Sequence, residues 1–145
     1  MPRLRASAER LGQIAASEGL PYNQERLMTY NSRDAQELAL LADAKGKGVA
    51  FHDAVFRAYF VDGANISDRA TLLALAVAAG LDRAEAAETL EKRTLARELD
   101  LQWARTREKG ITGVPTFEAG GAMVVGAQGY DVLAKLVRDA RARAR

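Results

Sequence analysis

A short β-hairpin pattern at residues 113–125 is the feature that most constrains the fold, because the other segments of the chain are helical in pattern. Pro115 opens an apolar run, and a Gly-Gly pair then turns the chain into a second run, Met123–Val125. Proline has no N–H to donate to a ladder, so it stands at the first residue of a strand or on an edge. Ordered X-Pro bonds in such places are also where cis peptides are found. We therefore expect Val114 to direct free backbone groups at whatever lies beside the loop.

The composition is that of a soluble globular protein. The chain has 145 residues, enough for one hydrophobic core, and 48% of them are hydrophobic and 28% charged. The net charge is only +2, and the basic excess is confined to the end of the chain. After residue 129 there are five basic residues against two aspartates: Lys135, Arg138, Arg141, Arg143 and Arg145. We interpret them as a solvated helix face and expect no nucleic-acid partner.

The chain contains no cysteine. This excludes a disulfide, a thiolate zinc site and thiol catalysis by these residues alone. The amino end is amphipathic and bears arginines, without the apolar stretch of a signal peptide, and no apolar run approaches 18 residues. We therefore expect a cytoplasmic protein without a membrane span.

Periodic apolar residues predict six helices, a hairpin and a final helix, without an internal repeat. The helices are expected at residues 4–18, from 31 or 32 to 45, at 49–61, 67–79, 82–92, from 94 to about 109, and from about 130 onward. Ser67 with Asp68, and Asp82 with Glu85, have the residue types and spacing of helix N-terminal caps. The predicted fold class is therefore α+β and mostly helical, with a division between residues 1–109 and 110–145.

The predicted sheet is incomplete, because a two-stranded hairpin is marginally stable by itself. The best further strand candidate, Glu25–Thr29, is weak. Either the hairpin packs only on helices, or another molecule completes its sheet. A free edge invites pairing, so we expect a homodimer formed through the sheet.

Other candidate sites have ordinary structural interpretations. His52 is the only histidine and stands beside Asp53 without a second group of metal-binding residue types, so we expect no metal site. Apolar and aromatic residues between 51 and 60 cluster on one side of a helix and are interpreted as core. Glycines 46 and 48 lack the frame of a phosphate-binding loop. We expect no cofactor and no catalytic residue within this chain.

Several stretches of the chain resemble the carboxyl portion of the DsbA family of thioredoxin-like oxidoreductases, and they occur in the same order as in that family. The similarity is greatest to the FrnE subgroup, whose relatives include 2-hydroxychromene-2-carboxylate isomerase and kappa-class glutathione transferases. The stretches that carry the resemblance are Asn31–Arg33 with Ala35, Ala54–Phe60, Ile66–Asp68, Ala79–Asp82, Gly110–Phe117 and Gly126–Gln128. The resemblance implies a helical insertion domain at residues 1–109, followed by the carboxyl ββα part of a thioredoxin-like fold.

The chain departs from this family in one respect that affects activity. The family has an opening strand, a Cys-x-x-Cys motif and a further strand before the helical block, and none of them is present in this sequence. The catalytic serine of the isomerase and transferase relatives belongs to the same missing part. We therefore expect a truncated thiol–disulfide oxidoreductase that has no dithiol activity by itself.

The resemblance also implies a substrate site. Pro115 corresponds to the cis-proline that faces the dithiol, and Val114, with Thr116 beside it, to the backbone segment that pairs with a thiol-containing peptide or glutathione. Gln128 lies in a loop that contacts the tripeptide in the glutathione-using relatives. Two alternatives stay open: a glutathione-dependent isomerase or transferase, and a non-catalytic helical module that dimerises through the hairpin.

Overall fold

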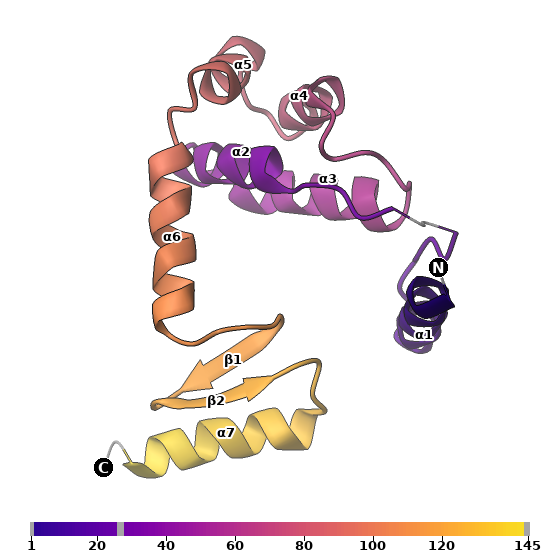
Figure 1. The fold of residues 1–145 in the computed structure, drawn as a ribbon, viewed down its shortest axis with the longest axis vertical. Coiled ribbons are helices and arrows are strands. Elements are labelled where there is room, and N and C mark those ends of the chain that lie inside the picture. The colour runs from indigo at the N-terminus through magenta and orange to yellow at the C-terminus, as the bar shows by residue number, and fades with distance from the viewer. Residues whose placement is uncertain (1, 26–27, 144–145) are drawn as a thin grey trace. The chain divides into compact units, whose positions relative to one another are not determined.

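The computed structural model describes residues 2–25 and 28–143, which form seven helices and one two-stranded sheet. The elements are α1 (Pro2–Ser17), α2 (Arg33–Ala44), α3 (Gly48–Phe60), α4 (Arg69–Ala78), α5 (Arg83–Lys92), α6 (Ala96–Glu108), β1 (Thr116–Ala119), β2 (Ala122–Val125) and α7 (Tyr130–Arg143) (Figure 1). The mostly helical α+β class is confirmed. The weak strand candidate Glu25–Thr29 includes residues 26 and 27, which lie outside the described residues.

The chain divides into two compact units, Met1–Leu99 and Asp100–Arg145. The division falls inside α6, whereas the division predicted from the sequence, after residue 109, lies just beyond the end of that helix. The predicted domain boundary stays a prediction. Each unit has its own packing, and each is described separately below.

The core of the first unit is built around α2, which packs against α3, α4 and α5. Leu38 of α2, Phe51 of α3, Leu72 of α4 and Leu90 of α5 are at most 1% exposed and belong to one hydrophobic cluster. Leu38, Phe51 and Leu72 belong to the apolar faces from which their helices were predicted, whereas the helix of Leu90 was predicted from its cap residues. Their burial removes most of their apolar surface from water, at roughly 1.5–3 kcal/mol for each large side chain.

Side-chain caps begin two of these helices where the sequence predicted them. Asp68 accepts a hydrogen bond from the backbone N–H of Thr71 at 2.8 Å, and Asp82 accepts one from the N–H of Glu85 at 2.8 Å. The bond from Thr71 also lowers the pKa of the Asp68 carboxyl, because it favours the charged form. Both caps satisfy N–H groups that have no partner inside the helix.

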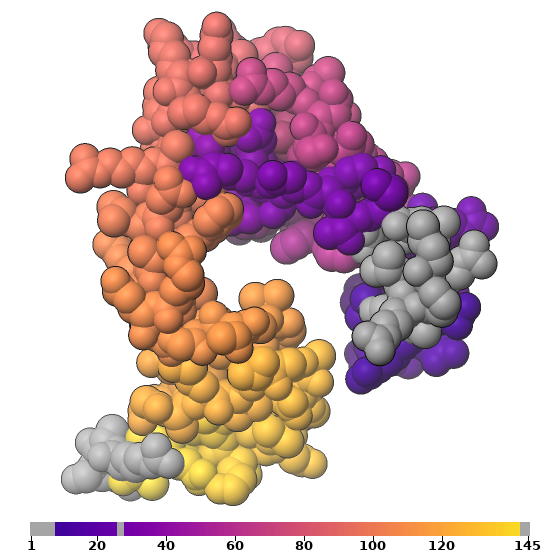
Figure 2. Space-filling view, viewed as in Figure 1, coloured from indigo at the N-terminus to yellow at the C-terminus, as the bar shows by residue number. Residues whose placement is uncertain are grey.

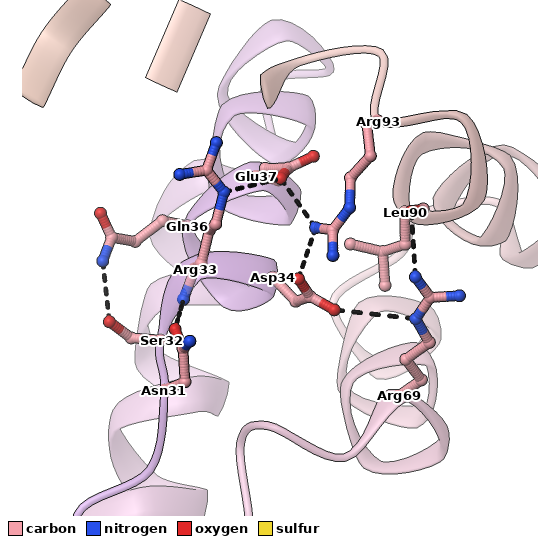
Figure 3. Close-up of polar contacts among 9 residues, drawn as sticks. All are labelled: Asn31, Ser32, Arg33, Asp34, Gln36, Glu37, Arg69, Leu90 and Arg93. Atoms are coloured by element: carbon pink, nitrogen blue, oxygen red, sulfur yellow. Dashed lines mark hydrogen bonds and ion pairs between the residues drawn. The ribbon is translucent and has the colours of Figure 1, made fainter. Parts of the chain in front are cut away.

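An ionic cluster around the buried Glu37 side chain joins α2 to the segment that follows α5 (Figure 3). The Glu37 side chain is completely buried, and its Oε1 accepts a hydrogen bond from Arg93 Nη1 at 2.8 Å. The same Arg93 nitrogen is 2.5 Å from Oδ1 of Asp34, and this bond raises the pKa of the Arg93 guanidinium. Arg69 at the start of α4 lies 3.7 Å from Oδ2 of Asp34 and donates to the Leu90 carbonyl. Three segments of the unit, α2, the start of α4 and the end of α5, therefore meet at two carboxylates.

The backbone of Arg93 adopts a conformation that favours glycine. Its φ is +54°, and it is the only non-glycine residue with positive φ among those described. It forms the C-terminal cap of α5, and its N–H donates to the Thr89 carbonyl. A side chain in this region costs free energy relative to glycine. We infer that the bonds to Glu37 and Asp34 offset this cost.

The second unit consists of the hairpin and α7, which packs against both strands. Gly120 and Gly121, with φ of +56° and +76°, form the two-residue connection that the sequence predicted. Gly120 is also required by packing, because a Cβ there would stand 2.9 Å from the Cβ of Ala140 on α7. Figure 2 shows the surface of this unit in orange to yellow.

We predict that Arg93→Gly lowers the free energy of unfolding by about 1–2 kcal/mol, although glycine suits the backbone at this position. The substitution leaves the buried Glu37 carboxylate with only its longer contact, 3.6 Å to Arg33 Nε, and a buried charge that loses its closest partner destabilises the fold. Chemical denaturation followed by circular dichroism measures the change.

The double variant Glu37→Met/Arg93→Gly serves as the control. It removes both charges and keeps side-chain volume in the core, so it should recover most of the lost stability. A double variant as unstable as Arg93→Gly alone would show that the loss does not come from the stranded carboxylate.

Candidate functional site

The loop between α6 and β1 holds Val114 and Pro115, and Thr116, a third residue predicted to bind substrate, is the first residue of β1. Gly110, with φ of +70°, ends α6, and the chain then runs without regular structure to Thr116. Lys109 Nζ lies 2.7 Å from Oε2 of Glu118, which fastens the start of this loop to β1. The loop is therefore tied to the hairpin at both of its ends.

The two residues that flank Val114 are held by hydrogen bonds. On one side, the Thr116 hydroxyl donates to the carbonyl of Gly113 at 2.6 Å. On the other, the carbonyl of Pro115 accepts from the backbone N–H of Gly126 at 2.7 Å, which continues the hairpin ladder. The Val114–Pro115 peptide bond is cis. These contacts fix the backbone on both sides of Val114.

Val114 itself is open to solvent. It is 89% exposed, and its backbone N–H and C=O have no hydrogen-bond partner in the described part of the chain. One donor and one acceptor on the same residue can form a short β-pair with an extended peptide. The structure thus brings Val114, Pro115 and Thr116 together in one restrained loop with an unpaired backbone segment at its centre.

Gln128, the fourth predicted site residue, precedes α7 by two residues. Its Nε2 donates to the backbone carbonyl of Val125 at 2.9 Å, so part of its hydrogen-bonding capacity is used inside its own unit. No local pattern in the sequence indicates this contact. Its contact with a ligand stays a prediction.

His52 lies on α3, in the first unit. Its ring is 6.1 Å from that of Phe56, and it lines an apolar groove of about 300 Å³ between α2 and α3. The groove is lined by Ser32, Ala35, Gln36, Ala39, Phe51, His52, Val55, Phe56, Tyr59, Phe60 and Ile66. No group of three or more metal-binding side chains occurs among the residues that the structure describes.

The groove corrects part of the interpretation of the aromatic cluster as core. Phe51 is 1% exposed and does lie in the core, but Phe56 is 55% exposed. The aromatic residues of α3 cover a wider arc of the helix than its neighbours bury. Periodicity identifies such an apolar face, but it does not show how far the neighbouring helices extend over it.

The ionic cluster of Glu37 and Arg93 was missed by the sequence analysis. Glu37 stands beside Leu38 on a helix with an apolar stripe, and a charged residue on the buried side of a helix is the signal that could have found it. Arg33 stands four positions before Glu37, a spacing at which an ion pair is visible in the sequence, but Arg93 is 56 positions away, so no local pattern joins Arg93 to Glu37.

Comparison with known proteins agrees with the resemblance. Residues 1–138 match the family described as DSBA-like thioredoxin domain. A Bacillus subtilis (strain 168) protein, the uncharacterized protein YwbO, is 38% identical over 97 residues, which are 64% of this chain and 47% of that protein.

The crystal structure of the probable DsbA oxidoreductase SCO1869 from Streptomyces coelicolor superposes with a TM-score of 0.85 at 32% identity. The match covers 95% of this chain and 60% of that one. The chain therefore spans about half to three fifths of the length of these relatives. None of the helices in the described ranges is long and apolar enough to cross a membrane. From the match over residues 1–138, the chain belongs to the DSBA-like thioredoxin domain family.

Proposed function

We propose that this chain is the helical and substrate-docking portion of a DsbA-like thiol–disulfide oxidoreductase, of the FrnE subgroup. In this proposal Val114 pairs through its backbone with a thiol-containing peptide, and Pro115 and Thr116 hold the loop in place. The observation that carries the proposal is the unpaired, 89% exposed backbone of Val114 between two fixed neighbours. A segment fixed before binding loses little conformational entropy when its partner arrives.

The reaction itself needs a thiolate that this chain does not have. In thiol–disulfide exchange a thiolate attacks one sulfur of a disulfide, a new S–S bond forms, and the other sulfur leaves as a thiolate. These 145 residues contain no cysteine, so the attacking group has to come from outside them. The role proposed for this chain is to position the substrate sulfur.

The glutathione-dependent alternative has weaker support. In that function Gln128 would contact the tripeptide, but its amide nitrogen already donates to the Val125 carbonyl, and it carries no charge to attract a carboxylate. The arrangement around Val114 serves either substrate, because a backbone pair does not depend on the side chain it meets. We therefore favour the thiol-containing peptide as the substrate class.

The first prediction concerns Val114. We expect Val114→Pro to weaken binding of a peptide that contains S-methylcysteine by about three- to tenfold, because it removes one backbone donor worth about 0.5–1.5 kcal/mol. Val114→Ala is the matched control: it keeps the N–H and should bind like the unaltered chain. Titration followed by NMR measures both affinities. Equal losses in the two variants, or no shift of the Val114 amide in the unaltered chain, would contradict the proposal.

The second prediction concerns Thr116. Thr116→Val keeps the shape of the side chain but removes the hydroxyl that donates to the Gly113 carbonyl. We expect the unfolding free energy to fall by about 1 kcal/mol, and the same peptide to bind more weakly, because the loop loses one of the two hydrogen bonds that hold the residues flanking Val114. Thr116→Ser, which restores the donor, should recover the affinity. If it binds as weakly as Thr116→Val, the hydrogen bond does not hold the loop.

The third prediction concerns activity. Because the nucleophile of dithiol exchange is a thiolate, we expect this chain to leave the rate of insulin reduction by dithiothreitol unchanged. Turbidity of the precipitating insulin chain measures the rate, with a thioredoxin as the positive control. An acceleration above dithiothreitol alone would mean that the chain supports reduction by another chemistry.

A further inference from the structure

The hydrogen-bond pattern of the hairpin shows which backbone groups of β2 point outward. Residues pair as Thr116↔Val125, Phe117↔Val124, Glu118↔Met123 and Ala119↔Ala122, and Gly126 N–H donates to the Pro115 carbonyl. Opposed residues of an antiparallel pair alternate between hydrogen-bonded and non-hydrogen-bonded. The bond between Gly126 and Pro115 makes the pair two steps further in, Phe117 and Val124, hydrogen-bonded as well. The N–H and C=O groups of Met123 and Val125 therefore point away from β1.

These outward groups are largely without partners. The Val125 carbonyl accepts one hydrogen bond, from Gln128 Nε2, and keeps a second lone pair. The other three groups have no partner in the portion of the chain that the structure describes. An edge of this kind is a template for another strand.

The two edges of the hairpin differ in chemistry. β2 has the sequence Ala-Met-Val-Val, with no charge and no proline, and its Met123 and Val125 side chains are 41% and 53% exposed. β1 instead carries Glu118, whose carboxylate is paired with Lys109. Charged side chains are a common means by which proteins protect an edge strand, so β1 has a protection that β2 lacks.

We propose that β2 pairs antiparallel with β2 of a second copy of this chain. A twofold axis through Val124 places Met123 opposite Val125 of the other copy, and each such pair exchanges two hydrogen bonds. The four bonds use the outward groups of both strands. Met123 and Val125 of the two copies then lie on the same face as cross-strand apolar neighbours.

A second copy fits this edge because the edge complements itself. Its outward donors and acceptors are equal in number, and the absence of charge means that two copies do not repel each other. Pairing through β1 would instead bring two Glu118–Lys109 pairs into one interface. The contact involves one four-residue strand from each copy, so we expect a dimer that forms at high concentration.

Amide hydrogen exchange at low and high protein concentration tests the register directly. The N–H groups of Met123 and Val125 should exchange about tenfold more slowly once nine tenths of the chain is paired, because exchange then requires dissociation. The outward N–H groups of Thr116 and Glu118 on β1 should not change. Protection on β1 alone, or no concentration dependence, would overturn the proposal.

Val125→Pro and Glu118→Pro form a matched pair of variants. Each removes one outward N–H from an edge and leaves the bonds between the two strands intact. In sedimentation experiments, Val125→Pro should be monomeric at every concentration, whereas Glu118→Pro should associate like the unaltered chain. The opposite result would place the contact on β1 and overturn the assignment.

Met123→Pro tests the same edge if Val125→Pro does not fold, as judged by circular dichroism. The wild-type chain could instead stay monomeric and bind an unrelated extended peptide at β2. That result would show that the β2 edge is not occupied by a second copy, and it would overturn the proposal. The outcome is separate from that of the proposed function, because none of the three variants alters Val114.

Discussion

The burial of Glu37 is the constraint on which the helical unit depends. A carboxylate that is completely removed from water is tolerated only where a cation meets it. Two cations meet Glu37: Arg33 lies 3.6 Å away on the same helix, and Arg93, from beyond the end of α5, is closer at 2.8 Å. To do so, Arg93 takes a backbone conformation that suits glycine, and it also bonds Asp34, which in turn faces Arg69 at the start of α4. Hydrophobic packing of Leu38, Leu72 and Leu90 brings these helices together. The ionic cluster selects one arrangement among those that the apolar stripes allow, because a shift of α5 along α2 would strand the buried charge.

In the second unit, the candidate sites consist of backbone N–H and C=O groups that have no hydrogen-bond partner among the described residues. The Thr116 hydroxyl bonds the Gly113 carbonyl and the Gly126 N–H bonds the Pro115 carbonyl, while the backbone of Val114 between them has no hydrogen-bond partner among the described residues. The same ladder directs the groups of Met123 and Val125 outward along β2. One end of the hairpin is thus suited to an extended substrate and one edge to another strand. These are two separate surfaces, since one lies at the loop before β1 and the other along β2.

Much of the fold could be predicted from the sequence. The helices and the caps at Asp68 and Asp82 follow from apolar periodicity and from residue types at helix ends, both of which depend on residues three or four positions apart. The hairpin follows from two short apolar runs joined by a Gly-Gly pair. The position of Pro115 at the strand entrance followed from the chemistry of proline alone. The partial exposure of Phe56 was not predictable in this way, because it depends on how far a neighbouring helix reaches. The bond from Gln128 to Val125 was also missed, since its geometry depends on how the chain leaves β2.

The sequence by itself therefore determined the order and type of the elements, the absence of a thiol from these residues, and the place of Pro115 before the first strand. Each of these depends on the chemistry of single residues or on the spacing of apolar residues along the chain. The tertiary structure decided that Glu37 is buried against Arg93, that the backbone of Val114 is unpaired between fixed neighbours, and which groups of β2 point outward. These properties depend on the register and burial of segments that meet only after folding, and no local pattern encodes them.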